Sequence, residues 1–293
     1  MRCEPREGSA ECACLLAGAT GAIGRLLLPL LVAEGHEVFG CSRSASGLEQ
    51  IRSQGAEPIQ ADVFDRELLA AAVSRVRPEA IIHQLTALSA GNAQENARIR
   101  REGTRNLVDA ALAAGTQRLI AQSIAWIYEP GLEPARESTP LDSTDVEPRA
   151  TTVRAVRALE AAAAELPEHV VLRNGTFYGP GTWYAAGGLM EQRLRAGKLA
   201  ANDSVTSFIH VRDAARAALQ ALRWPSGTYH VVDDEPARAR DWLPRFAATL
   251  QLPAPSPSEG RSAEWERGAS NALARSLGWQ AEYASWRSGF APG

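Results

Sequence analysis

CACLLAGATGAIG, residues Cys12 to Gly24, is the stretch of sequence that decides the fold. The apolar run Cys14–Ala17 predicts a buried strand, and the run Arg25–Glu34 predicts a helix that Pro29 should kink. A further run, His36–Cys41, predicts a second strand. A glycine-rich turn between the strand and the helix of such a βαβ unit is typical of a dinucleotide-binding site rather than of a turn that binds nothing.

The glycines of this turn, at positions 18, 21 and 24, have a physical reason to be glycine. They let the chain turn sharply, bring its backbone close to a pyrophosphate and allow the helix to pack tightly on the strand. The helix then directs its first N–H groups at the anion. We therefore expect the cofactor to contact the turn through Gly18, Thr20, Gly21, Ala22, Ile23 and Gly24.

The end of the second predicted strand indicates which dinucleotide is preferred. Enzymes that prefer NAD usually carry an acidic residue here for the ribose 2′-hydroxyl, whereas a nearby arginine accommodates a 2′-phosphate. No acidic residue occurs between Cys41 and Leu48, and Ser42 is followed by Arg43. The sequence therefore favours NADP and leaves NAD open. The alternative is that Arg43 is an ordinary solvated loop residue.

Composition narrows the classes of function. The chain has 293 residues, 45% of them hydrophobic, and a net charge of −3, so it can fill a core but offers no basic surface for nucleic acid or a membrane. Residues 1–11 do not resemble a signal peptide, and no apolar run approaches the roughly 20 residues of a membrane span. The cysteines lack the second pair or the histidines of a metal site. We expect no metal, reduced thiols and a cytoplasmic location. The four cysteines are Cys3, Cys12, Cys14 and Cys41.

The glycine spacing is G-x-x-G-x-x-G, and from this point the chain resembles the extended short-chain dehydrogenase/reductase superfamily, the NAD(P)-dependent epimerases, dehydratases and reductases. The resemblance extends from about residue 12 to residue 290. Its further segments are Asp62-Val63, residues 81–87 (IIHQLTA), residues 102–108 (EGTRNLV), residues 173–181 (RNGTFYGPG), residues 207–215 (SFIHVRDAA) and residues 271–279 (NALARSLGW).

The resemblance implies an α/β fold, with a Rossmann-type doubly wound parallel sheet and a small C-terminal substrate lobe. It places the NAD(P)-binding domain at residues 12–175 and the substrate lobe mainly at residues 176–293, with a strand at 228–232 returning to the sheet. Outside the glycine turn, it implies cofactor contacts from Ser42, Arg43, Asp62, Val63, Leu85, Thr86, Asn174 and Phe177.

The resemblance also places a catalytic serine at the end of the fifth strand, where Ser123 can hold a substrate oxygen. The superfamily's second signature, Tyr-x-x-x-Lys on the helix expected at residues 151–165, is missing. Lys198 is the only lysine in the chain, and no tyrosine stands four residues before it. The usual acid–base pair is therefore absent in any register of the helix.

Other residues are candidates for the missing roles. Tyr178 or Tyr184 could donate the proton, although both could equally be aromatic walls of a pocket. Arg157 could replace the lysine as an anchor for the ribose, but an arginine stays protonated and cannot relay a proton. We expect His83 to be a structural histidine rather than a catalytic base.

These observations favour an NAD(P)-dependent oxidoreductase that acts on a small carbonyl or alcohol substrate with a non-standard proton donor. The alternatives are a nucleotide-sugar epimerase or dehydratase, and a regulator that binds NADP without catalysis. In many relatives two long helices, expected here at residues 92–114 and 151–165, form a four-helix dimer interface. A homodimer is therefore an expectation that the sequence leaves open.

Overall fold

The predicted βαβ unit is present in a computed structural model, which describes residues 12–87 and 91–290. Strand β1 (Ala13–Ala17) leads through the glycine turn into helix α1 (Gly24–Ala33), and strand β2 (Glu37–Ser42) follows. β1 and β2 pair in parallel, from Ala13 opposite Glu37 to Ala17 opposite Cys41. Of the four cysteines, Cys3 lies outside the described residues, and the other three are buried.

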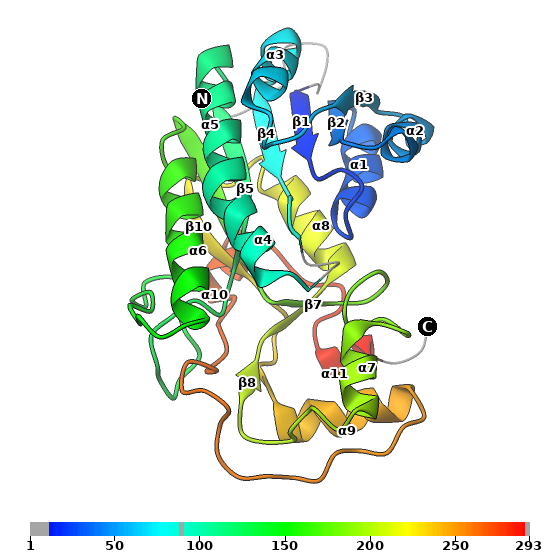
Figure 1. Ribbon diagram of the computed structural model, residues 1–293, viewed down its shortest axis with the longest axis vertical. Helices are drawn as coiled ribbons and strands as arrows, with labels where there is room; N and C mark the ends of the chain where they lie inside the picture. The colour runs from blue at the N-terminus through cyan, green and yellow to red at the C-terminus, as the bar shows by residue number, and fades with distance from the viewer. Residues whose placement is uncertain (1–11, 88–90, 291–293) are drawn as a thin grey trace. The chain divides into compact units, whose positions relative to one another are not determined.

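The unit is the centre of a seven-stranded sheet with the order β10-β6-β5-β4-β1-β2-β3 (Figure 1). The order reverses direction at β1, so the predicted doubly wound Rossmann-type sheet is confirmed. The pairs β1–β2, β1–β4, β2–β3 and β4–β5 are parallel. The remaining strands are β3 (Glu57–Gln60), β4 (Ala80–His83), β5 (Arg118–Ile124), β6 (Glu168–Asn174) and β10 (Gly227–Val231).

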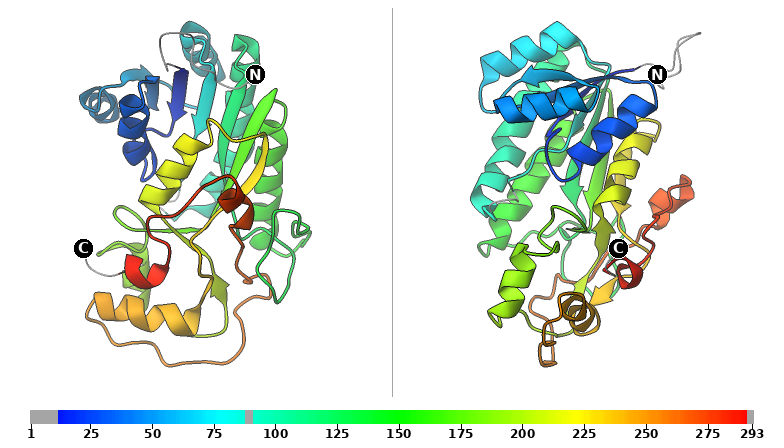
Figure 2. Two further views of the ribbon diagram at one scale, coloured as in Figure 1. Left: turned by 180° about the vertical axis from the view of Figure 1, so that it is seen from behind. Right: turned by 90° about the vertical axis from the view of Figure 1, so that its right-hand side faces the viewer.

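Helices cover both faces of this sheet. The right-hand view of Figure 2 shows α5 and α6, in teal and green, on one face and α1, in dark blue, on the other. Apolar side chains of α3, α5 and α6 form one buried core with those of the strands. The helices are α2 (Ala45–Ser53), α3 (Arg66–Val76), α4 (Ala93–Arg98), α5 (Thr104–Ala114), α6 (Arg149–Ala163) and α8 (Val211–Gln220). A π-helical segment, η2 (Ile99–Gly103), joins α4 to α5, so the long helix expected at 92–114 is present with a change of pitch.

Helix α1 continues through Pro29. Proline has no N–H, so the carbonyl of Arg25, four residues earlier, loses its partner in the helix. The side-chain amide of Gln54, at the end of α2, donates to that carbonyl at 3.0 Å. A neighbouring helix thus supplies the hydrogen bond that the proline removes.

Contacts within the chain group it into two compact units, each built from three segments. The first comprises residues 1–123, 144–172 and 215–228, and the second comprises residues 124–143, 173–214 and 229–293. The boundary expected at 175/176 lies near one of the points where the chain passes between units. The second unit contains β7 (Thr176–Tyr178), α7 (Leu189–Arg195), β8 (Val205–Thr206), β9 (Phe208–His210), β11 (Ala237–Arg238), α9 (Ala239–Thr249), α10 (Ala272–Ser276) and α11 (Trp286–Gly289).

The second unit has its own core, which is mostly aromatic. β7 pairs in parallel with β9, and β8 pairs antiparallel with β11. The ring of Phe208 in β9 packs edge to face with Trp242 of α9 and with Phe290, which directly follows α11, and both centroid distances are 5.3 Å. The C-terminal helix α11 is therefore part of this core, and Trp286 is fully buried.

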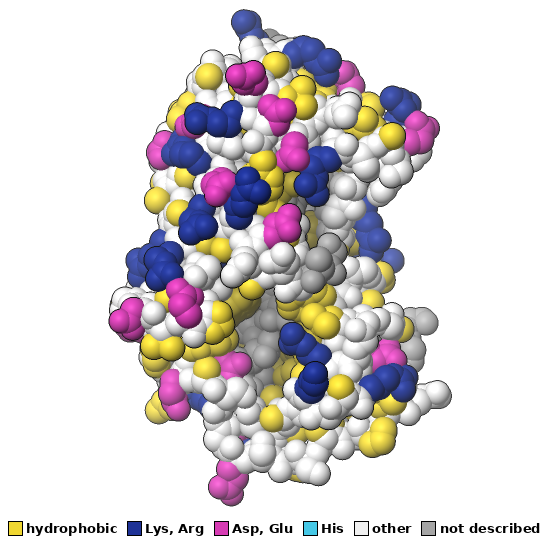
Figure 3. All heavy atoms as spheres, in the orientation of Figure 1, with side chains coloured by type: hydrophobic (Ala, Val, Ile, Leu, Met, Phe, Trp, Pro, Cys, Tyr) yellow, Lys and Arg dark blue, Asp and Glu magenta, His cyan; other side chains and the backbone are white. Residues whose placement is uncertain are grey.

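Charges of both signs are mixed on the surface of the first unit. Figure 3 shows blue and magenta side chains interspersed over the region of α3 and α5. Arg105 of α5 pairs with Asp109 at 2.8 Å and with Glu165 at 2.6 Å. None of the helices in the described ranges has the length and apolar content of a bilayer-spanning segment.

Candidate functional site

The glycine turn holds the backbone in a form that other residues would disrupt. Gly18 has φ +94°, and a Cβ there would lie 2.8 Å from the backbone of Gln84. A Cβ on Gly24 would lie 2.1 Å from the carbonyl oxygen of Gly18. Thr20 and Gly21 are exposed at the tip of the turn, whereas Ile23 is buried beneath it. The turn therefore leaves open backbone at the N-terminus of α1, as a pyrophosphate cradle requires.

Two predicted cofactor residues meet at the ends of β2 and β3. Arg43, directly after β2, lies 3.7 Å from the carboxylate of Asp62, and the two side chains are 68% and 35% exposed. Asp62 also accepts from the backbone N–H of Phe64 at 3.0 Å. The Ser42 hydroxyl accepts from the N–H of Ser44. Among the described residues Arg43 is thus held by a weak surface ion pair, which a phosphate could replace.

Val63, Leu85 and Thr86 also lie in the first unit, after β3 and β4. The side-chain amide of Asn106 donates to the Val63 carbonyl at 2.7 Å, which fixes that loop to α5. The N–H of Leu85 donates to His83 Nδ1 at 3.3 Å, and His83 Nε2 lies 2.8 Å from the Thr104 hydroxyl. Burial, and then the charge of Arg100, lower the pKa of His83 to about 4. Both ring nitrogens serve the fold, which is the structural role expected for this histidine.

The hydroxyl of Ser123 points into the first unit. It is 1% exposed and donates to Glu160 Oε1 of α6 at 2.6 Å. Arg100 of the π segment is also buried, and its pKa falls to about 10 because of burial, against the opposing charge of Glu160. Sequence reasoning named Ser123 but assigned no role to Glu160 or Arg100. Arg157 lies on the exposed side of α6, one turn from Glu160.

The other predicted site residues belong to the second unit. Asn174 ends β6, is 2% exposed and accepts from the N–H of Ala125 at 2.8 Å through its backbone carbonyl. Phe177 is half-buried in β7. The structure thus places these two residues and both candidate tyrosines in one unit, and Ser123, Arg157 and the glycine turn in the other.

The two tyrosines occupy the aromatic core of the second unit. Tyr178 is fully buried, and its hydroxyl has no hydrogen-bond partner in the described part of the chain. Desolvation, followed by the charges of Asp233 and Asp213, raises its pKa. Tyr184 is half-buried against Phe208 and Phe246, and desolvation raises its pKa as well. A raised pKa makes both phenols weaker acids at neutral pH.

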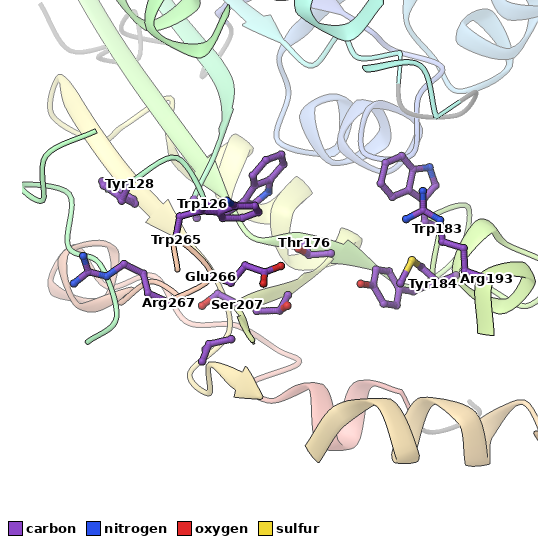
Figure 4. A pocket seen from close by; sticks show the side chains of 15 residues that line it. Trp126, Tyr128, Thr176, Trp183, Tyr184, Arg193, Ser207, Trp265, Glu266 and Arg267 are labelled. Atoms are coloured by element: carbon purple, nitrogen blue, oxygen red, sulfur yellow. The ribbon is translucent and has the colours of Figure 1, made fainter. Parts of the chain in front are cut away.

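The second unit contains a cavity of about 320 Å³, which Tyr184 borders (Figure 4). In Figure 4, Trp126 and Trp265 lie together on one side of the cavity with Glu266 below them, and Trp183 and Arg193 lie on the other side. All of its lining residues belong to this unit: Ala125, Trp126, Tyr128, Thr176, Trp183, Tyr184, Met190, Arg193, Val205, Thr206, Ser207, Trp265, Glu266, Arg267 and Gly268.

Sequence reasoning missed most of this cavity. The residues come from separate segments, and those at 265–268 follow a stretch with few regular elements, so no local periodicity points to them. Of the residues that border the cavity, the sequence analysis had named Tyr184 as a possible aromatic wall of a pocket. In residues 12–87 and 91–290 no cluster of three His, Cys, Asp or Glu side chains is arranged to hold a metal.

A Rossmann-type sheet with a glycine turn at its switch point defines a dinucleotide-binding protein. A sequence profile of the NAD dependent epimerase/dehydratase family matches residues 14–232. The chain therefore belongs to the NAD dependent epimerase/dehydratase family, within the extended short-chain dehydrogenase/reductase superfamily.

One relative is similar over nearly the whole chain. The chain is 44% identical, over an alignment of 303 residues, to a 3-diazoavenalumate denitrifying reductase from a Streptomyces species, and the alignment covers 94% of this chain and 98% of the relative. This similarity supports an oxidoreductase within the family.

Solved structures share the fold. The WbmG enzyme of Bordetella bronchiseptica, crystallised with NAD and UDP, superposes with a TM-score of 0.76 at 22% identity, covering 97% of this chain and 94% of WbmG. The UDP-glucose 4-epimerase of Thermus thermophilus, crystallised with NAD, gives a TM-score of 0.73 at 22% identity, covering 94% and 95% of the two chains.

Proposed function

We propose that this protein is an NAD(P)H-dependent reductase that replaces the diazo group of an organic acid by hydrogen and releases dinitrogen. The observation that carries the proposal is the missing Tyr-x-x-x-Lys pair, in a chain 44% identical to a denitrifying reductase. A reaction that needs no proton donor explains why the chain can lack the pair.

The balance of the reaction gives the physical reason. When bound, the reduced nicotinamide supplies a hydride. At the carbon of a diazonium group the new C–H bond takes the electron pair of the hydride, and dinitrogen leaves with the electron pair of the broken C–N bond. No proton is gained or lost. Reduction of a carbonyl, in contrast, leaves an alkoxide that must be protonated, which is the usual work of the Tyr–Lys pair.

The chain's own residues fit the dinucleotide. The turn at Gly18 and Gly24 leaves no room for a Cβ and exposes backbone at the N-terminus of α1, where the pyrophosphate would bind. Arg43 would hold a 2′-phosphate, so we propose NADP as the preferred cofactor. Asn174 and Phe177 stay predicted cofactor contacts.

A carbonyl or alcohol reductase is the second candidate, and Tyr184 at the cavity supports it. In that reaction Tyr184 or Tyr178 donates the proton, Ser123 holds the substrate oxygen and Arg157 anchors the ribose. The raised pKa of both tyrosines and the engagement of the Ser123 hydroxyl by Glu160 weigh against this assignment. The epimerase and regulator alternatives lack a supporting observation of this kind.

The experiment supplies 4-diazoniobenzoate with NADPH deuterated at C4 and measures dinitrogen release and deuterium in the benzoate. We expect one deuterium per dinitrogen at the former diazonium carbon, and kcat within a few-fold of wild type for Tyr178→Phe and Tyr184→Phe. A panel of aldehydes and ketones and a UDP-sugar are assayed in parallel. Turnover of a carbonyl alone, abolished by Tyr184→Phe, would replace the proposal with the second candidate.

Two further proposals concern the setting of the protein. Its described thiols are all buried, and those of Cys14 and Cys41 are free, which suits a reducing compartment such as the cytoplasm. We also propose a homodimer through α5 and α6. Light scattering at several concentrations tests it, and a monomer at all of them would contradict it.

A further inference from the structure

We propose that the cavity of the second unit binds the substrate as a planar aromatic acid, with Trp126 and Trp265 against the ring, Arg193 at the carboxylate and Glu266 at a hydroxyl on the ring. This inference rests on the proposed function only for the identity of the ligand as the substrate. The binding preference follows from the cavity itself.

The aromatic wall selects for a flat ligand. The rings of Trp126 and Trp265 have centroids 6.0 Å apart and planes inclined by 34°. Trp126 is 38% exposed, so part of its ring surface is accessible to a ligand. Trp183 stands on the opposite side of the cavity (Figure 4). Indole faces bind conjugated rings more strongly than saturated rings of similar size.

Arg193 is the cation of the cavity that remains available for a ligand. Arg195, on the same helix α7, is held by Glu191 at 2.7 Å. Arg267 donates its Nε to the carbonyl of Glu133 at 2.6 Å and is committed to that loop. Arg193 is exposed and makes no ion pair within the described part of the chain. A guanidinium pairs with a planar carboxylate through two parallel hydrogen bonds.

Glu266 adds an acceptor to the same cavity. Its Oε2 accepts from the Ser204 hydroxyl and from the N–H of Ala263, so the carboxylate is fixed in place. These bonds leave Oε1 for a donor on the ligand, such as a phenolic hydroxyl. The cavity thus offers one ligand both a cation, Arg193, and a fixed acceptor, Glu266. Its volume of about 320 Å³ is at the low end for ligand pockets, as a single-ring acid requires.

Binding is measured by calorimetry on the full chain with saturating NADP⁺, which needs no turnover. The probes are 4-hydroxycinnamate, its methyl ester, cinnamate and 3-cyclohexylpropanoate. We expect 4-hydroxycinnamate to bind at least about 10-fold more tightly than the cyclohexyl acid. Arg193→Gln should raise its Kd about 10-fold and leave the Kd of the ester unchanged. Arg195→Gln, the matched control on the same helix, should change neither.

Two more variants distinguish the contribution of the ligand's ring to binding from that of its hydroxyl. Trp126→Leu should raise the Kd of both aromatic acids and of the ester alike, by roughly 3- to 10-fold. Glu266→Gln keeps an oxygen for Ser204 and Ala263, and it should reduce the preference for 4-hydroxycinnamate over cinnamate. Equal binding of the cyclohexyl acid, or equal weakening of acid and ester by Arg193→Gln, would overturn the inference.

The outcomes for the two proposals are distinguishable. If 4-hydroxycinnamate binds as expected and no diazonium acid is reduced, the proposed function fails and the cavity assignment stands. If diazonium acids are reduced with a KM that Arg193→Gln and Trp126→Leu leave unchanged, the cavity assignment fails and the proposed function stands.

Discussion

The hydroxyl of Ser123 is a donor that the fold itself uses, because it is buried and bonded to Glu160. Ser123→Ala should therefore lower the free energy of unfolding by about 1.5–3 kcal/mol, the usual range for a hydrogen bond to a charged group. Urea denaturation measures it, with the exposed Ser53 changed to Ala as the control. Unchanged stability together with a lost kcat would instead assign the hydroxyl to the substrate.

Arg43 decides the choice of cofactor in the proposed function. Arg43→Gln should raise the Kd for NADP by about 10-fold and leave that for NAD unchanged, because only NADP carries the 2′-phosphate. Fluorescence titration with both cofactors measures the change. Arg52→Gln, which removes an equally exposed arginine paired with Glu49, is the matched control. An equal loss for both cofactors would contradict the NADP preference.

At the scale of elements, the contact between α1 and α2 makes a quantitative prediction. Gln54→Ala leaves the Arg25 carbonyl without its donor and should cost about 1 kcal/mol. In the Pro29→Ala background an N–H is available to that carbonyl, so the same change should cost much less. A double-mutant cycle by urea denaturation measures the coupling. Additive effects would show that Gln54 does not compensate for the proline.

The helix bounds that the sequence predicted best are those with a capping residue at the N-terminus and a terminating residue at the C-terminus. The apolar face of residues 66–76 predicts a helix with these bounds, and α3 (Arg66–Val76) agrees because Asp65 caps its first turn and Arg77, in a left-handed conformation, ends it before Pro78. Helix α2 was not anticipated, although Ser44 caps it through the N–H of Gly47. Its nine residues contain only two large apolar side chains, Leu48 and Ile51, which are too few to mark a helix in the sequence.

The site was predictable only where one local segment forms it. The glycine turn depends on steric demands within a few residues, so the sequence was enough to locate it. The pairing of Ser123 with Glu160, and the meeting of Trp126, Arg193 and Trp265 at one cavity, depend on tertiary packing between distant segments. Neither spacing nor periodicity carries that information.

At the scale of the whole molecule, buried titratable groups set the dependence of stability on pH. Burial raises the pKa of Asp233 to about 8, so the folded chain holds a proton there that the unfolded chain releases near pH 4. Stability should therefore fall as pH rises from 4 to 8 through this group. The pKa values of His83 and His210 are lowered to about 4, so these groups act in the opposite direction. Their contribution to stability is lost as pH falls from 6.5 to 4.

The substitution Asp233→Asn tests whether this carboxyl group makes stability fall as pH rises. The amide oxygen can still accept from the N–H of Trp286, now bonded to the carboxylate at 2.8 Å, while the buried charge is removed. The variant should gain stability relative to the wild-type protein as pH rises from 5 to 8, by about 1 kcal/mol or more, in urea denaturation at each pH. A difference that does not vary with pH would show that Asp233 keeps an ordinary pKa.

The division into two units gives each of them its own spectroscopic label. The described cysteines all belong to the first unit, and burial raises the pKa of Cys41 to about 12, so its thiol reacts with a disulfide reagent only after that unit opens. All the tryptophans except Trp224 belong to the second unit, so indole emission reports mainly on that half. Thiol exchange and fluorescence, followed on one unmodified sample, therefore time the opening of each half separately and show whether the two halves open as one.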